Sequence, residues 1–275
     1  MKVSLSNIEI NNEIKKVVLS VLDSKKFILG EHTKKFEENF AKLSGVKYAA
    51  CVNSGTAALF LTLKSLGIKK NDEVILPSLS YVATSTPVSM LNAKPKFVDV
   101  NEKNYTIDVD AIEKNITKKT KGIIPVHLYG HPANMDKIKK IAKENSLFVL
   151  EDAAQAHGAK YNNKPIGSLG NAACFSFYPS KNLTVCGDGG IVVSNNSDLI
   201  KKIKILRDHG RTEKYVHNVL GYNLRFNEIQ AAIGNIMLKK LPSSNASRRK
   251  IAKYYDQELN SKVITPYIEK WATPV

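Results

Sequence analysis

Two residues of opposite charge follow apolar segments of the sequence, and together they could do chemistry. Asp152 ends the segment SLFVLED (146–152), and Lys181 follows AACFSFYP (172–179). In an open parallel sheet, ligands bind outside the carboxyl ends of such strands. A lysine there could form a Schiff base if burial or a nearby cation lowered its pKa, and an acid beside it could hold a protonated pyridine nitrogen, as around pyridoxal phosphate. The alternative, a surface lysine and a helix-capping aspartate, is favoured when spacing alone is considered.

A turn of small residues, Ser54-Gly55-Thr56, precedes a segment expected to be a helix (54–67). The N–H groups at a helix N-terminus, next to residues small enough to allow close approach, make an anion site. Simple N-capping by Ser or Thr is the common alternative, and the turn by itself leaves both interpretations open.

Two other motifs do not support the chemistry that they first suggest. The run Gly187-Asp188-Gly189-Gly190 has Val192 where a dinucleotide-binding fingerprint needs glycine, and it precedes a strand instead of opening a helix. His127 and His131 are four residues apart, but Gly130 and Pro132 oppose a helix there and no carboxylates complete a metal site. We therefore expect no metal, and expect the loop that carries the histidines to contact substrate or cofactor.

Short β-branched runs alternate with helical patterns along the chain, which predicts an α/β fold with a mostly parallel sheet covered on both faces. From Asn227 a helical pattern follows that we expect to break at Pro242 and then resume. The last residues, ITPYIEKWATPV (264–275), begin like a strand with nothing after it to pair with. The predicted strands are 48–53, 72–77, 96–100, 122–128, 146–152, 172–179 and 189–195, and the predicted helices between them are 54–67, 81–91 and 135–145.

Composition excludes several classes of protein. The 275 residues carry 41 Lys plus Arg against 25 Asp plus Glu, a net charge of +16, but only five of the basic residues are Arg and the lysines are dispersed. Nucleic-acid binding usually needs clustered basic groups, so we expect no nucleic-acid partner. No apolar run approaches a membrane span, and the N-terminus has no signal-peptide stretch, which predicts a cytoplasmic protein that does not bind membranes. The three cysteines lack CxxC spacing, which suits a reducing compartment.

Taken together, these segments resemble the DegT/DnrJ/StrS family of pyridoxal-phosphate-dependent nucleotide-sugar aminotransferases. The resemblance rests on SGTAALFLTL, DEVILPSLSYVAT, KFVDV, PVHLYGHPANMD, EDAAQAHGAKY, GSLGNAACFSFYPSKNLTVCGDGGIVVSN and GYNLRFNEIQAAIG, which run in the family's order from about residue 25 to 255. It implies the three-layer α/β/α large domain of fold type I, plus an incomplete small C-terminal domain.

The resemblance also implies a role for each matching residue. Lys181 would form the Schiff base (the internal aldimine) with pyridoxal 5'-phosphate, and Asp152 would pair with the pyridinium nitrogen. Tyr81 would stack on the ring and Gln155 would contact its hydroxyl edge. The remaining cofactor contacts would come from the phosphate-binding turn at Gly55, from the Thr56 and Ala57 amides and the Ser176 hydroxyl, and from Asn223 of a neighbouring subunit, which implies a homodimer with shared active sites.

The chemistry implied is a ping-pong transamination between an amino donor, glutamate in this family, and a keto sugar bound through its nucleotide diphosphate. Lys181 would then act as the general base and acid. Asp188 stands where many members carry Glu, which clouds the substrate assignment. Neither the sugar and nucleotide nor the choice between C3 and C4 amination can be read from the sequence.

Family members usually continue for about another hundred residues, consistent with a length short of two full domains. We therefore expect a helical segment at 1–25, the cofactor-binding domain at 26–240, and the start of a small, apparently truncated domain at 241–275. The alternative function is a truncated or regulatory homologue that binds the cofactor or a partner without turnover.

Overall fold

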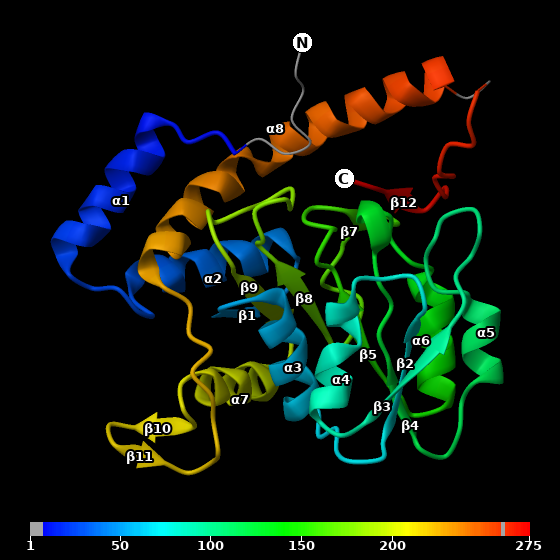
Figure 1. Ribbon diagram of the computed structural model, residues 1–275, viewed down its shortest axis with the longest axis horizontal. Helices are drawn as coiled ribbons and strands as arrows, with labels where there is room; N and C mark the ends of the chain where they lie inside the picture. Colours follow the sequence, from blue (N-terminus) through cyan, green and yellow to red (C-terminus); the bar gives the residue numbers. More distant parts are fainter. Residues whose placement is uncertain (1–7, 260–261) are drawn as a thin grey trace.

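A seven-stranded sheet forms the centre of the protein, as the computed structural model shows for the residues it describes, 8–259 and 262–275 (Figure 1). The strand order is β1-β9-β8-β5-β4-β2-β3. β9 is antiparallel to both of its neighbours, and the pairs from β8 to β3 are parallel. The bounds are β1 Tyr48–Val52, β2 Glu73–Pro77, β3 Lys94–Val98, β4 Thr120–Ile123, β5 Phe148–Asp152, β8 Ala172–Ser176 and β9 Gly190–Ser194.

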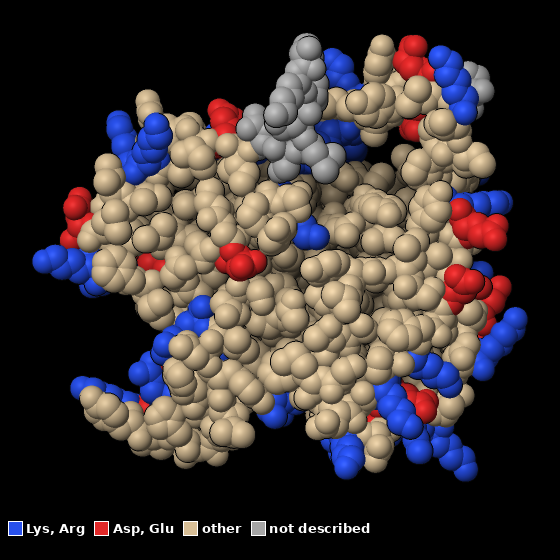
Figure 2. All heavy atoms as spheres, in the orientation of Figure 1, with Lys and Arg blue, Asp and Glu red and all other residues tan. Residues whose placement is uncertain are grey.

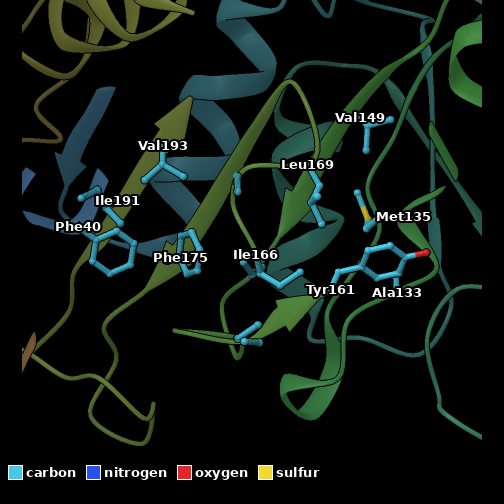
Figure 3. Close-up of a cluster of buried hydrophobic side chains, with 14 of the residues drawn as sticks. Phe40, Ala133, Met135, Val149, Tyr161, Ile166, Leu169, Phe175, Ile191 and Val193 are labelled. Carbon is cyan, nitrogen blue, oxygen red and sulfur yellow. The ribbon is translucent and has the colours of Figure 1, made fainter. Parts of the chain in front are cut away.

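Helices cover both faces of this sheet. Along β1, Ala49 and Cys51 join one buried cluster, whereas Ala50 and Val52 join the other, because successive strand residues point to opposite faces. Figure 3 shows part of the first cluster, where the helical residue Phe40 packs edge-on against Phe175 of β8, on one face of the sheet. The first face is covered by α2 Glu31–Leu43, α5 Val109–Lys114, α6 Met135–Glu144 and α8 Glu228–Leu259, and the second by α3 Gly55–Ser65, α4 Thr86–Met90 and α7 Ser197–Arg207. The predicted three-layer α/β/α fold is confirmed.

The first turn of α8 holds the start of α2 in place. The buried Glu228 carboxylate accepts hydrogen bonds from the N–H groups of Gly30, His32 and Thr33, at 2.8–2.9 Å, and from the Thr33 hydroxyl. A carboxylate at a helix N-terminus satisfies orphan donors and complements the helix dipole. The helix α1 (Asn12–Ser24) packs on the other side of α8, within the segment predicted as helical over 1–25, of which residues 1–7 lie outside the described part.

Two helix predictions are wrong, and proline is involved in both. The helix expected at 81–91 is divided into the 3₁₀ turn η1 (Val82–Thr84) and α4, because Pro87 lies at the start of α4, where a proline fits a first turn but not a helix interior. In contrast, α8 continues through Pro242 without a break. An interior proline costs about 3 kcal/mol, but Leu241 and Asn245 are buried on either side of it, and their packing offsets that cost.

The C-terminal segment, predicted to begin like a strand with nothing after it to pair with, forms its strand at its end and pairs with an earlier part of the chain. β12 (Ala272–Thr273) pairs with β6 (Lys160–Tyr161), which pairs in turn with β7 (Lys164–Pro165). The Trp271 carbonyl also accepts a 2.7 Å hydrogen bond from the Asn162 N–H. The predicted domain boundary at residue 240 falls inside α8, and the division remains a prediction.

A hairpin of β10 (Arg211–Glu213) and β11 (Val216–His217) projects from the body of the molecule (Figure 1). Tyr215 and Leu220 in and beside it are each 83% exposed. On the face drawn in Figure 2, basic side chains are scattered, mostly around the edge, and acidic ones lie among them. No helix in the described ranges is long and apolar enough to cross a membrane. The three cysteines are free thiols.

Candidate active site

A cavity of about 500 Å³ lies where β5 and β8 end. Its lining comes from six parts of the chain: the N-terminus of α3, the segment around η1, Val126 after β4, the end of β5, the end of β8, and the loop from β8 to β9. Seven of the predicted residues line it: Gly55, Thr56, Tyr81, Asp152, Gln155, Ser176 and Lys181. The topology therefore brings together residues that are up to 126 positions apart in the chain (Gly55 to Lys181).

Asp152 is a buried carboxylate at the bottom of this cavity. Thr84 Oγ1 donates a 2.7 Å hydrogen bond to Oδ2, and the Ala154 N–H donates to Oδ1 at 3.2 Å. Burial raises the pKa of Asp152, although these two hydrogen bonds and the nearby Lys181 cation oppose the increase. A buried carboxylate whose charge is costly is stabilised by a cation placed opposite it, which a protonated ring nitrogen would provide.

Lys181 lies in the loop between β8 and β9, with its backbone N–H bonded to the Tyr178 carbonyl at 2.9 Å. Burial lowers the pKa of its ammonium group, and the Asp152 charge partly opposes this effect. A lowered pKa increases the fraction of free amine near neutral pH, which is the form that attacks a carbonyl. The lysine thus has the electrostatic surroundings that Schiff-base chemistry requires.

The N-terminus of α3 forms a cradle against the ends of β8 and β9. The Ser54 hydroxyl accepts the Ala57 N–H at 3.1 Å, so Ser54 is the N-cap. A Cβ added at Gly55 would lie 2.8 Å from the Ser176 Cβ, and one added at Gly190 would lie 2.3 Å from the Ser54 carbonyl oxygen. Glycine at both positions lets these three parts of the backbone approach closely. Both interpretations of the turn, cap and anion site, are compatible with this geometry.

Tyr81 and Gln155 lie in the same cavity with side chains available to a ligand. Tyr81 is 74% exposed and immediately precedes η1. Gln155 Oε1 accepts the Tyr129 N–H at 2.7 Å, which fixes the orientation of the amide and directs its Nε2 donor elsewhere. An exposed aromatic ring and an oriented amide donor are suited to a planar ligand that carries an oxygen.

Two of the predicted cofactor contacts do not line the cavity. The Ala57 N–H is bonded to the Ser54 hydroxyl, so the amide predicted to hold phosphate already has an acceptor. Asn223 is exposed and pairs with Asp208 in an isolated bridge, outside the cavity of its own chain. Its predicted role concerned a neighbouring subunit and remains a prediction.

The two histidines of the loop that was expected to contact the ligand form hydrogen bonds within the protein. The fully buried His127 contacts the Glu151 carboxylate through Nε2 at 3.1 Å and accepts the Ala133 N–H through Nδ1. His131 accepts the Glu269 N–H. The loop that carries them reaches the site through Val126 and through the Tyr129 N–H that orients Gln155. Among the described residues no group of His, Cys, Asp and Glu could hold a metal ion.

Several residues that line or support the cavity were not predicted as site residues. Thr84 is 2% exposed and holds Asp152, and the Ser80 hydroxyl lies 2.7 Å from the Thr84 hydroxyl. Both belong to SLSYVAT (78–84), in which Tyr81 was the only predicted site residue. The hydroxyl groups of this segment, which follows a strand end, were the feature of the sequence that could have indicated a partner for Asp152. Tyr178, Ser180 and Asp188 also line the cavity.

The fold is that of the pyridoxal-phosphate-dependent aminotransferases, and the cavity contains the lysine and the buried carboxylate that such enzymes use. The chain belongs to the DegT/DnrJ/EryC1/StrS aminotransferase family, whose model matches residues 8–272.

Three known proteins show the degree of similarity. A pleiotropic regulatory protein of Geobacillus stearothermophilus is 42% identical, over 94% of this chain and 70% of its own. The UDP-N-acetyl-3-dehydro-alpha-D-glucosamine 3-aminotransferase of Acidithiobacillus ferrooxidans is 44% identical, over 91% and 68%. The crystal structure of DesV from S. venezuelae in complex with a ketimine intermediate matches with a TM-score of 0.92 and 41% identity, over 95% and 71%. The chain spans about seven tenths of the length of each.

Proposed function

We propose that this protein is a pyridoxal-phosphate-dependent aminotransferase that moves an amino group from glutamate to a nucleotide-linked keto sugar, for amino-sugar or polysaccharide biosynthesis. The observation that carries the proposal is that Lys181 and the buried Asp152 lie in one cavity. Burial lowers the pKa of Lys181, which favours the free amine that the reaction needs. Burial raises the pKa of Asp152, so that its charged form is stabilised by pairing with a cation.

The residues of the cavity match the parts of the cofactor. Gly55 and Thr56 at the start of α3, with the Ser176 hydroxyl, would hold the phosphate, because the first N–H groups of a helix have no acceptor within the helix. Asp152 would pair with the ring nitrogen, Gln155 would donate to the ring hydroxyl, and Tyr81 would cover the ring face. The bound cofactor supplies an electron sink for the carbanion formed at the substrate carbon.

Lys181 would have two roles in this reaction. Its amine would hold the cofactor, and the free amine would also serve as the general base and acid that moves the proton of the reaction. Burial supports the second role, because a lowered pKa brings the amine closer to the working pH. Thr84 would keep the Asp152 carboxylate oriented through its 2.7 Å hydrogen bond.

The substrate and the assembly are inferred from relatives and from the surface. The name of the A. ferrooxidans relative, an aminotransferase of a UDP-linked 3-dehydro sugar, supports a nucleotide-linked keto sugar as acceptor. A homodimer with shared sites is supported by Asn223, which is exposed outside the cavity of its own chain. It is also supported by the exposed side chains of Tyr215 in the projecting hairpin and of Leu220 beside it. We place the protein in the cytoplasm, a reducing compartment that suits its three free thiols.

The experiment is optical. Purified protein supplied with pyridoxal phosphate should show a visible absorption band, and the band should be missing in Lys181→Ala. A wild-type protein that stays colourless with added cofactor would contradict the proposal.

A second candidate is a regulatory homologue that binds the cofactor without turnover, which the similarity to the pleiotropic regulatory protein of G. stearothermophilus supports. This candidate predicts a band that glutamate bleaches, but no amino-sugar product with any nucleotide-keto-sugar. A product with even one such sugar favours the aminotransferase.

A further inference from the structure

Helix α8 buries two asparagines, and one of them reaches the loop that carries Lys181. Asn245 is 3% exposed. Its Nδ2 donates to the His157 carbonyl at 2.8 Å, and its Oδ1 accepts a hydrogen bond from Asn182 Nδ2 at 3.1 Å. Asn182 Nδ2 also donates to the same His157 carbonyl at 3.0 Å. The two side-chain amides and one backbone carbonyl thus form a closed set of three hydrogen bonds.

Asn182 directly follows Lys181, so these three hydrogen bonds fix the position of the backbone from which the Lys181 side chain extends. Beyond Asn182, the buried side chains of Leu183 and Val185 fix the loop in the core. Lys181 has a different environment, because its side chain extends into the cavity. Asn182 therefore attaches the lysine loop to the later part of α8 through polar, directional contacts, whereas Gln230 near the start of α8 binds the Asp188 carbonyl at the other end of the loop.

The surroundings of Asn245 are fitted to this arrangement. Gly158, next to His157, has a φ of +84°, and a Cβ there would lie 2.9 Å from Asn245 Nδ2. Any larger residue at 158 would be strained and would displace the asparagine amide. The His157 ring packs against Phe40, Phe175 and Phe177, so the segment that presents the carbonyl is itself held by the core.

We propose that Asn245 is a positioning residue for Lys181, acting through Asn182 and the His157 carbonyl. The inference rests on the proposed function, because it concerns the amine that would bind the cofactor. Asn245 does not line the cavity, and it lies beyond the helix-interior proline. Its effect on Lys181 is one of orientation.

The helix provides a matched control. Asn235 is also a buried asparagine of α8, at 8% exposure, and its side chain makes three hydrogen bonds: from Asn39 and to the carbonyls of His32 and Ala231. The bonds with Asn39 and His32 attach α2, the bond to Ala231 lies within α8, and none of the three involves the lysine loop. Asn245→Ala and Asn235→Ala thus remove similar side chains from one helix, and only the first removes a link to Lys181.

The experiment measures Lys181 before any turnover. Each cofactor-stripped variant is mixed with pyridoxal phosphate, sampled over time into sodium borohydride, and digested to quantify the modified Lys181 peptide. Thermal unfolding of the cofactor-free proteins is recorded beside it. We expect Asn245→Ala to slow capture about tenfold, the factor that corresponds to one lost hydrogen bond, and to shift the pH midpoint of the visible band. Asn235→Ala should lower the melting temperature comparably while leaving both quantities within twofold of the wild type.

A double variant tests the route. Asn182→Ala should slow capture as much as Asn245→Ala, and Asn182→Ala/Asn245→Ala should be no slower than Asn182→Ala alone, since both remove the same link. Equal capture rates in Asn245→Ala, Asn235→Ala and wild type would overturn the inference, as would fully additive effects in the double variant. If Asn245→Ala does not fold, the comparison of Asn182→Ala with Asn235→Ala decides in the same way. Failure of the proposed function is separate, because then the wild type itself would not capture the cofactor at Lys181.

Discussion

Removal of the Thr84 hydroxyl tests how the protein maintains a buried carboxylate. Thr84 Oγ1 and Asp152 Oδ2 are 2.7 Å apart, and the two residues are 2% and 4% exposed. A hydrogen bond to a charged group contributes about 1.5–3 kcal/mol, so Thr84→Val, which keeps the shape of the side chain, should lower the free energy of unfolding by about that amount. The Ala154 N–H remains as a second donor, which favours the lower end of the range.

This loss should depend on pH. The hydrogen bond from Thr84 stabilises the ionised form of Asp152 and lowers its pKa, against the larger effect of burial. The difference between wild type and Thr84→Val is therefore largest above the folded-state pKa of Asp152, and it shrinks as the pH falls below that value and the carboxyl protonates. Urea unfolding of the cofactor-free proteins, at neutral pH and in the acid range, measures both differences.

Thr62→Val is the matched control. Thr62 is fully buried, and its hydroxyl donates a 2.7 Å hydrogen bond to a neutral acceptor, the Ala58 carbonyl. Its removal should cost about 1 kcal/mol at either pH. A Thr84→Val loss below about 0.5 kcal/mol at neutral pH, or one as independent of pH as that of the control, would refute the view that Thr84 supports a buried charge.

Three further predictions concern the cradle and the buried ionisable groups. Gly190→Ala would place a Cβ 2.3 Å from the Ser54 carbonyl oxygen and so push the cradle apart. We expect pyridoxal phosphate titrations, followed by absorbance, to show at least about tenfold weaker binding. Unchanged binding would mean that the cradle is not the phosphate site. Burial lowers the pKa of His157 from 6.5 to about 3, so the protein should lose stability as the pH falls below 6.5, by at most about 1.4 kcal/mol per pH unit from this ring. Unfolding of His157→Phe at several pH values should lack that component, and a pH dependence equal to the wild type would contradict it. Burial raises the folded-state pKa of Asp152, so the cofactor-free protein should lose stability as the pH rises through that pKa. Asp152→Asn should not show this loss in urea unfolding. A loss of the same size in the variant would contradict Asp152 as its source.

The sequence was sufficient to predict the sheet and the chemical centre of the cavity. Strands that are buried on both faces are nearly continuous apolar runs, so SLFVLED and AACFSFYP were recognisable. The rule that ligands bind at the carboxyl ends of strands allowed Asp152 and Lys181 to share a pocket, but spacing alone favoured a surface lysine and a capping aspartate, and the family resemblance decided between the two. The family resemblance then supplied Tyr81, Gln155 and Ser176, all of which line the cavity.

What could not be predicted depends on tertiary contacts. Whether Pro242 ends a helix depends on the burial of Leu241 and Asn245, which no local pattern reveals. The pairing of β12 with β6 joins segments more than a hundred residues apart, and the sequence does not specify such a partner. His127 and Glu151 face each other inside the protein, so a histidine in a strand-end loop had a structural role where a ligand contact was expected.

The movement of nitrogen tests the central claim most directly. Wild type and Lys181→Ala, each supplied with pyridoxal phosphate and ¹⁵N-labelled glutamate, would be incubated with a panel of nucleotide-linked keto sugars, and the products would be weighed by mass spectrometry. The account predicts ¹⁵N in an amino sugar for at least one member of the panel with wild type, and none with Lys181→Ala. If wild type converts no glutamate to its keto acid and labels no sugar, the proposal that Lys181 and Asp152 form a transaminase site is contradicted.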